Sequence, residues 1–93
     1  MYRIFMAPVQ QPGMLRLQAR QGVWEAMLAL HKARGDAETA QQLSGALIAA
    51  GYRDLKAPGV VPSPDTAETG PVIALVLPDR AARTVLLSAG VSA

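Results

Sequence analysis

Two runs within the first twenty residues fit the period of two that is typical of β-strands: Tyr2, Ile4 and Met6 would share one strand face, and Leu15, Leu17 and Ala19 alternate strictly with polar residues. Residues 2–9 form the first run, and Pro8 suits a strand end or a sheet edge because it has no backbone donor. Residues 15–20 form the second run, after a turn at residues 10–13. The pattern predicts a β-hairpin. The competing interpretation is a single helix over residues 14–34, in which neighbouring leucines of the second run would point in different directions.

The spacing then changes to the three-and-four repeat of amphipathic helices. Apolar residues recur with this spacing over residues 22–34, which predicts a first helix. Gly35 suits the left-handed residue that follows a helix, and Asp36 suits the N-cap of a second helix. We therefore expect a tight pair of helices. Small residues four apart on the second helix, among them Gly45 and Ala49, would allow a neighbouring element to approach closely.

The second half of the chain begins with residues 52–55, which suit a short strand. Residues 57–71 hold four prolines and two glycines and predict a long loop, which we expect to be flexible, with a binding role as the alternative. Residues 72–77 are continuously apolar, which predicts a central strand covered on both faces. Residues 79–90 carry a helical apolar stripe and predict a final helix. The alternative for this last segment is a β-hairpin through residues 78–83.

Together these segments predict a single domain of the α+β class over residues 1–93, because the chain is too short for two independent cores. The expected order is a β-hairpin, a pair of helices, a short strand, a long proline-rich loop, a buried strand and a C-terminal helix. With 51% hydrophobic and 17% charged side chains and a net charge of +2, the composition is typical of a chain that folds. A small core gains stability from oligomerisation, so we expect a homodimer among the partners.

The residue types needed for catalysis are scarce or scattered. Cysteine is absent, which excludes disulfides, thiolate nucleophiles and cysteine zinc sites. The one histidine, His31, follows apolar residues near the end of a predicted helix, and we interpret it as a packed residue there. The seven acidic residues form no pair on one helix face, and neither a nucleophile elbow nor a phosphate-binding loop is present. We therefore expect no enzymatic activity, no cofactor and no metal site.

The cellular setting is indicated by composition alone. The longest apolar stretch, residues 72–77, is far below the roughly 18 residues that a membrane span needs, so we expect no membrane contact. The N-terminus lacks the apolar centre of a signal peptide. The absence of cysteine fits a reducing compartment, so we expect a cytoplasmic protein. Seven arginines against two lysines, with abundant alanine, indicate a GC-rich coding sequence from a bacterium or a bacteriophage.

A row of polar side chains marks the second predicted strand. Arg16, Gln18 and Arg20 alternate with apolar residues, so all three should project from the solvent face. Two guanidinium groups and an amide in a row can hold phosphates or an acidic partner. Arg80 and Arg83, three residues apart at the start of the last helix, would extend this row if the fold brings them near. The competing interpretation is an ordinary solvated sheet face.

Aromatic residues are few. Proteins that bind single-stranded nucleic acid use aromatic side chains interleaved with basic ones. The four aromatic residues are Tyr2, Phe5, Trp24 and Tyr52, and along the sequence none of them is interleaved with the arginines. This weakens the hypothesis of nucleic-acid binding. Trp24 lies near the start of the first helix, where it either anchors the core or forms the centre of a binding interface.

By elimination, the sequence favours a small non-enzymatic protein–protein interaction module that acts as a regulator, an inhibitor or an assembly subunit of a larger complex. The tip of the 57–71 loop is one expected contact. The side chains expected to bind the partner are Arg16, Gln18, Arg20, Trp24, Arg80 and Arg83. The alternative is a nucleic-acid-binding regulator that uses the arginine-rich strand face.

Overall fold

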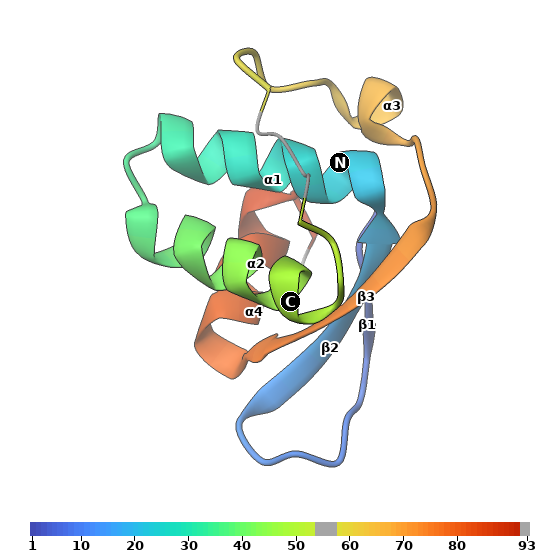
Figure 1. Cartoon of the computed structure of the whole chain (residues 1–93), viewed down its shortest axis with the longest axis vertical. Coiled ribbons are helices and arrows are strands. Elements are labelled where there is room, and N and C mark those ends of the chain that lie inside the picture. The colour runs from blue at the N-terminus through green and yellow to red at the C-terminus, as the bar shows by residue number, and fades with distance from the viewer. Residues whose placement is uncertain (54–57, 92–93) are drawn as a thin grey trace.

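A computed structural model describes residues 1–53 and 58–91 of the chain (Figure 1). Over these residues the fold is an antiparallel three-stranded sheet with four helices, so the predicted α+β class is confirmed. None of the helices in this part of the chain is long and apolar enough to cross a bilayer. The elements in chain order are β1 (Phe5–Ala7), β2 (Met14–Arg20), α1 (Gln21–Ala33), α2 (Ala37–Ala49), α3 (Pro64–Ala67), β3 (Val72–Pro78) and α4 (Asp79–Ser88).

Strand β2 is the central strand of the sheet, with β1 on one side and β3 on the other. The predicted hairpin is confirmed, because Met6 of β1 pairs antiparallel with Leu17 of β2. The prediction that residues 72–77 form the central strand is wrong. Strand β3 is an edge strand, and its burial alternates instead of being continuous, with Leu75 buried and Val72 60% exposed. A run of apolar residues predicts a strand but does not reveal how many of its faces are covered.

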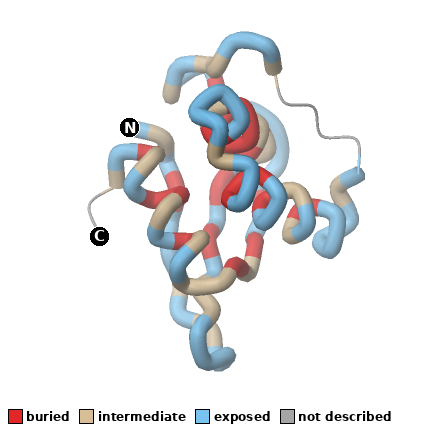
Figure 2. The backbone as a smooth tube through the Cα atoms, turned by 90° about the vertical axis from the view of Figure 1, so that its left-hand side faces the viewer, coloured by how far each residue is buried: buried red, intermediate tan, exposed pale blue. Residues whose placement is uncertain are grey.

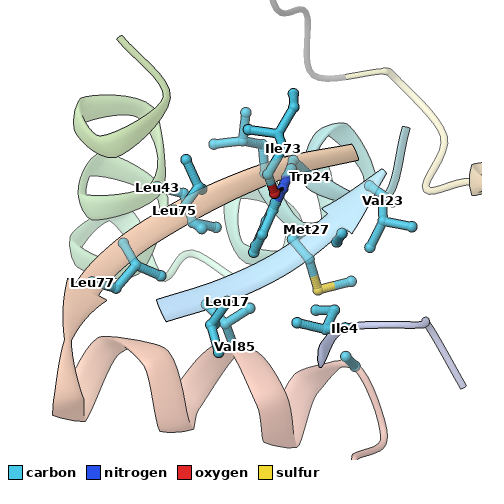
Figure 3. Close-up of a cluster of buried hydrophobic side chains, with 14 of the residues drawn as sticks. Ile4, Leu17, Val23, Trp24, Met27, Leu43, Ile73, Leu75, Leu77 and Val85 are labelled. Carbon is cyan, nitrogen blue, oxygen red and sulfur yellow. Dashed lines mark hydrogen bonds between the residues drawn. The ribbon is translucent and has the colours of Figure 1, made fainter. Parts of the chain in front are cut away.

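Helices α1, α2 and α4 cover one face of the sheet, which we call the inner face (Figures 1 and 2). The core lies between these helices and the inward side chains of β2 and β3 (Figure 3). Its largest fully buried residues include Trp24 of α1, Leu43 of α2, and Leu17 and Leu75 of the sheet. No helix or strand among the described residues covers the opposite face of the sheet, so its side chains there are exposed or half-buried.

The joint between α1 and α2 forms as predicted. Gly35 adopts the left-handed conformation (φ +74°), which favours a residue without a Cβ atom. Asp36 is the N-cap of α2, and its Oδ1 accepts a hydrogen bond from the backbone N–H of Thr39 at 3.1 Å. The alternative of one helix over residues 14–34 is excluded, because the chain is a strand up to Arg20 and becomes helical at the next residue.

The predicted loop at residues 57–71 contains a short helix, α3, that the sequence pattern did not predict. Ser63 is its N-cap. The segment after α3 packs on the start of α1, where Thr69 O accepts the backbone N–H of Gly22 at 2.9 Å. Residue 57 lies outside the described residues, and the flexibility of the loop stays a prediction. Of the predicted strand at residues 52–55, the first two residues lie in no strand and the last two lie outside the described part.

The final segment is a helix and not a hairpin. Helix α4 follows β3 without an intervening residue, and its buried side chains Ala82, Val85 and Leu86 face the core. In Figure 3, Val85 lies next to Leu17 of the inner face. Helix α4 therefore lies on the same side of the sheet as α1 and α2.

Candidate interaction surface

The uncovered side of the sheet carries the row of polar residues predicted from the sequence. We call this surface the open face. Because directly paired residues of an antiparallel sheet project to the same side, the register of the three strands defines it. It consists of Phe5 and Ala7 from β1, Met14, Arg16, Gln18 and Arg20 from β2, and Val72, Ala74, Val76 and Pro78 from β3.

The polar row on β2 projects to solvent as predicted, but its two arginines differ. Arg20 donates a hydrogen bond from Nη1 to the carbonyl oxygen of Gly70 at 2.8 Å, and its Nε lies 3.7 Å from Oε2 of Glu68. These contacts orient the Arg20 guanidinium along the end of the sheet. Arg16 is exposed and forms no ion pair or side-chain hydrogen bond with the described residues. Its guanidinium is therefore the more available of the two for an acidic group.

Phe5 is a surface residue that the sequence analysis did not connect with the arginines. It is 66% exposed and pairs with Gln18, the residue midway between Arg16 and Arg20. An aromatic side chain therefore does lie beside the arginines in space, although none is interleaved with them along the sequence. The six residues between β1 and β2 set this register, which alternation within each strand does not reveal.

Three of the predicted contact residues are not on the open face. Trp24 is fully buried, and its indole Nε1 donates a hydrogen bond to Ile73 O at 3.1 Å (Figure 3). It belongs to the core and has no surface to offer a partner. Arg80 and Arg83 lie on α4, across the sheet from the open face, so the fold does not extend the β2 row with them. Arg83 instead forms an i,i+4 ion pair with Asp79, with Nε and Oδ2 3.1 Å apart.

A groove of about 350 Å³ lies between α2 and the C-terminal end of β3, where Met14 of β2 also lines it. One wall is the end of the strand, with Val76, Leu77 and Pro78. The other wall is α2, which contributes Glu38, Gln41, Gln42, Gly45 and Ala46. A Cβ atom added at Gly45 would meet nothing within 4 Å in the described structure. Gly45 therefore lines a surface, and the close packing predicted for it is not formed within this part of the chain, whereas Ala46 packs against the core.

Among the described residues, His31 is a fully buried titratable side chain with an unusual environment. Its Nδ1 lies 3.1 Å from Oδ2 of Asp36, while Nε2 is buried without a hydrogen-bond partner among the described residues. Burial lowers the pKa of His31 below its usual 6.5, although the hydrogen bond and the negative charge of Asp36 act in the opposite direction. Hydrogen bonds from Thr39 lower the pKa of Asp36. The pair holds the start of α2 against the end of α1 with a neutral imidazole.

We expect the free energy of unfolding to fall as the pH is lowered below about 6.5. The unfolded chain takes up a proton at His31 in this range, whereas the folded chain resists it, so protonation favours unfolding. A second decrease should follow below pH 3.8, where Asp36 is protonated in the unfolded chain first. Urea unfolding at a series of pH values measures both. The variant His31→Gln should lose the first decrease, and an unchanged pH profile in that variant would contradict the assignment.

The described part of the chain contains no group of three or more His, Cys, Asp or Glu side chains that could hold a metal ion. Comparisons of the chain with protein-family models, with curated proteins and with solved structures find no significant match.

Proposed function

We propose that this chain is a non-enzymatic protein–protein interaction module that acts as a regulator, an inhibitor or an assembly subunit of a larger complex. Its partner binds to the open face, and a second copy of the chain is among its partners. The observation that carries the proposal is the exposure of large apolar side chains on this face, where Phe5 is 66% and Val72 60% exposed. Covering them with a partner removes apolar surface from water.

The composition of the open face supports a protein partner. Phenylalanine and arginine are both enriched in protein interfaces, and the mixture of apolar and guanidinium groups is suited to a partner with an apolar centre and acidic margins. Arg16 lies on this face between Ala7 and Val76, so an acidic side chain that pairs with it would be partly removed from water. The β3 side of the face is uncharged, which favours apolar contact there.

Nucleic-acid binding is the second candidate, and the position of Phe5 favours it. A base stacked on Phe5 would have Arg16 and Arg20 on either side for its phosphates, the combination used by proteins that bind single strands. This candidate predicts an affinity that falls steeply with added salt, because binding releases counterions from the nucleic acid. A protein interface centred on apolar side chains is much less sensitive to salt.

The experiment that separates the two candidates is a pull-down with the tagged chain from a GC-rich bacterial lysate, with and without nuclease treatment, read by mass spectrometry. Two variants, Phe5→Asp and Leu87→Asp, test the surface. Both residues are 66% exposed, but Leu87 lies on α4, so it is a matched control. The proposal predicts a stoichiometric protein that survives nuclease and moderate salt, is lost with Phe5→Asp and is kept with Leu87→Asp.

Other outcomes contradict the proposal in different ways. Equal retention by both variants would move the binding site away from the open face. Loss of every captured molecule after nuclease treatment would favour nucleic acid, and the double variant Arg16→Ala with Arg20→Ala should then abolish retention. If wild-type protein captures neither a protein nor a nucleic acid, the proposed function is wrong.

A further inference from the structure

The two edges of the sheet are protected to different degrees. Strand β1 is three residues long, with Pro8 directly after it, and such short strands near proline discourage pairing with other chains. Strand β3 is seven residues long and carries no charged side chain, and its prolines lie only at the ends, Pro71 before the strand and Pro78 as its last residue. Exposed edges of this kind pair readily with another strand, and proteins usually block them unless they are used. The difference points to β3 as an edge that is covered when the protein functions.

The outward backbone groups of β3 follow from the hydrogen bonds at the two ends of its pairing with β2. Gln21 N–H donates to Pro71 O and Asp79 N–H donates to Gly13 O, and both pairs continue the register of the strands. Because hydrogen-bonded pairs alternate in an antiparallel ladder, the odd-numbered residues of β3 direct their backbone groups to β2. The even-numbered residues therefore direct theirs to the free edge. These are Val72, Ala74, Val76 and Pro78.

We propose that a second copy of this chain pairs with β3 edge to edge, antiparallel about a twofold axis at Ala74, to form a continuous six-stranded sheet. In this register the outward backbone N–H and C=O groups of Val72, Ala74 and Val76 form hydrogen bonds with the other copy. Val72 then lies opposite the partner's Val76. Paired β-branched side chains on one face stabilise a sheet. Pro78 has no N–H to donate, but it lies beyond the paired residues, so no hydrogen bond of the proposed dimer is lost.

Helix α2 lies beside the same edge and is suited to the same partner. It contacts β3 and forms one wall of the groove at the C-terminal end of the strand. When two sheets join edge to edge, the outermost helices on the inner face of each copy become neighbours. A Cβ atom added at Gly45 would meet nothing within 4 Å in the described structure, and the absence of a side chain there allows those helices to approach closely. The open side of α2 at Gly45 thereby gains a packing partner.

Charge favours a copy of this chain over a basic or an acidic partner. The edge is uncharged, so pairing it with itself brings no like charges together. The groove wall of α2 has one charged residue, Glu38, seven residues before Gly45 and therefore about 10 Å away along the helix. In an antiparallel pair of helices that meet at Gly45, the two Glu38 side chains lie about 20 Å apart, beyond the range of strong repulsion in physiological salt.

This inference deepens the self-association in the proposed function and rests on it, but it is independent of the partner on the open face. The dimer uses the edge and α2, whereas Phe5 and Arg16 take no part in it. Failure of the lysate experiment would therefore leave the dimer in place. If the chain is monomeric but still captures a partner through Phe5, the dimer proposal is wrong and the proposed binding to the open face stands.

The test uses single cysteines, because the chain has none of its own. In the proposed register the two copies of Ala74→Cys have Cα atoms about 5.5 Å apart, within the range of a disulfide. Gln18→Cys is the matched control, since Gln18 is exposed on the same face and pairs with Ala74 on the neighbouring strand. In the proposed dimer the two cysteines of Gln18→Cys would be separated by three strand spacings, about 14 Å, which is too far for a disulfide. Mild oxidation should give a disulfide dimer with Ala74→Cys and none with Gln18→Cys.

Solution mass provides the second readout. Wild-type protein should elute as a dimer in size-exclusion chromatography with light scattering, and Ala74→Lys should weaken the dimer by about tenfold or more because two like charges meet at the axis. Gln18→Lys should leave it intact, and circular dichroism checks that both variants fold. A monomeric wild-type protein would overturn the proposal. So would a dimer that Ala74→Lys does not weaken, or one in which Gln18→Cys cross-links as fast as Ala74→Cys.

Discussion

Replacing Trp24 with alanine is expected to lower the free energy of unfolding by about 3–5 kcal/mol, the usual cost of removing a large buried aromatic side chain. Trp24 is fully buried among residues of the sheet and the helices. Single domains are stable by only about 5–15 kcal/mol, so this loss removes a large share of the total. Urea unfolding followed by far-ultraviolet circular dichroism measures it, because the single tryptophan is then lost as a fluorescent probe.

The variant Trp24→Phe separates packing from hydrogen bonding at this position. It keeps an aromatic ring in the core but removes the donor that bonds to Ile73 O at 3.1 Å. We expect a smaller loss of about 1–2 kcal/mol, since a typical buried hydrogen bond contributes about 1 kcal/mol and the smaller ring adds a packing defect. Equal losses for the alanine and phenylalanine variants would show that the hydrogen bond, and not the ring, is what Trp24 contributes.

The second large effect is expected at Gly22, in the first turn of α1. A Cβ atom there would lie within 3.0 Å of Ala67 O and of the Thr69 hydroxyl, closer than real Cβ atoms approach. The first of these atoms belongs to the backbone, so relief requires the segment after α3 to move. That movement would break the hydrogen bond from Gly22 N–H to Thr69 O. We expect Gly22→Ala to lower the free energy of unfolding by about 3 kcal/mol.

Gly45→Ala is the matched control, because the substitution is identical but the surroundings differ. Gly45 lies within α2, and a Cβ atom there meets nothing within 4 Å in the described structure. Alanine is the better helix former by about 0.8–1 kcal/mol, so this variant should be more stable than the wild-type protein when measured as a monomer. Urea unfolding of both variants checks the opposite signs. A destabilised Gly45→Ala monomer or an unchanged Gly22→Ala protein would contradict this account.

The elements that the sequence predicted well are those defined by neighbouring residues. The alternation in residues 15–20 and the helical spacing in residues 22–34 are local patterns, and both elements form within one residue of the predicted limits. Gly35 and Asp36 define the joint between α1 and α2 through their own conformation and side chain. Three polar residues of β2 were placed correctly on the solvent face for the same reason.

The features that were missed depend on contacts between distant parts of the chain. Whether β3 is central or lies at the edge is decided by which strands pair with it, and its apolar run is compatible with both. The position of Phe5 beside Gln18 depends on the hairpin register. Trp24 could have been a surface or a core residue until the helix that carries it was placed on the sheet.

Helix α3 had a local signature that was interpreted as a loop. Ser63 followed by Pro64 and Asp65 is a capping residue, a proline at the first helical position and an acidic residue in the first turn. The four-residue helix that follows is too short to show an apolar stripe. What could not be read from the sequence is the role of the segment after it, whose carbonyl groups cap α1 in place of a side chain at Arg20.

The separation of β2 from β3 along the chain has a consequence for protein synthesis. Strand β2 ends at Arg20 and β3 begins at Val72, so residues 21–71 must be made before the two strands can pair. At the usual rate of about 5–20 residues per second, this takes about 3–10 s. Helices α1 and α2 can form in that interval because their contacts are local. Leu17 and Ala19 of β2, however, remain without their partners in β3, Leu75 and Ile73. The nascent chain is therefore most prone to aggregation, and most in need of a chaperone, before β3 has been translated.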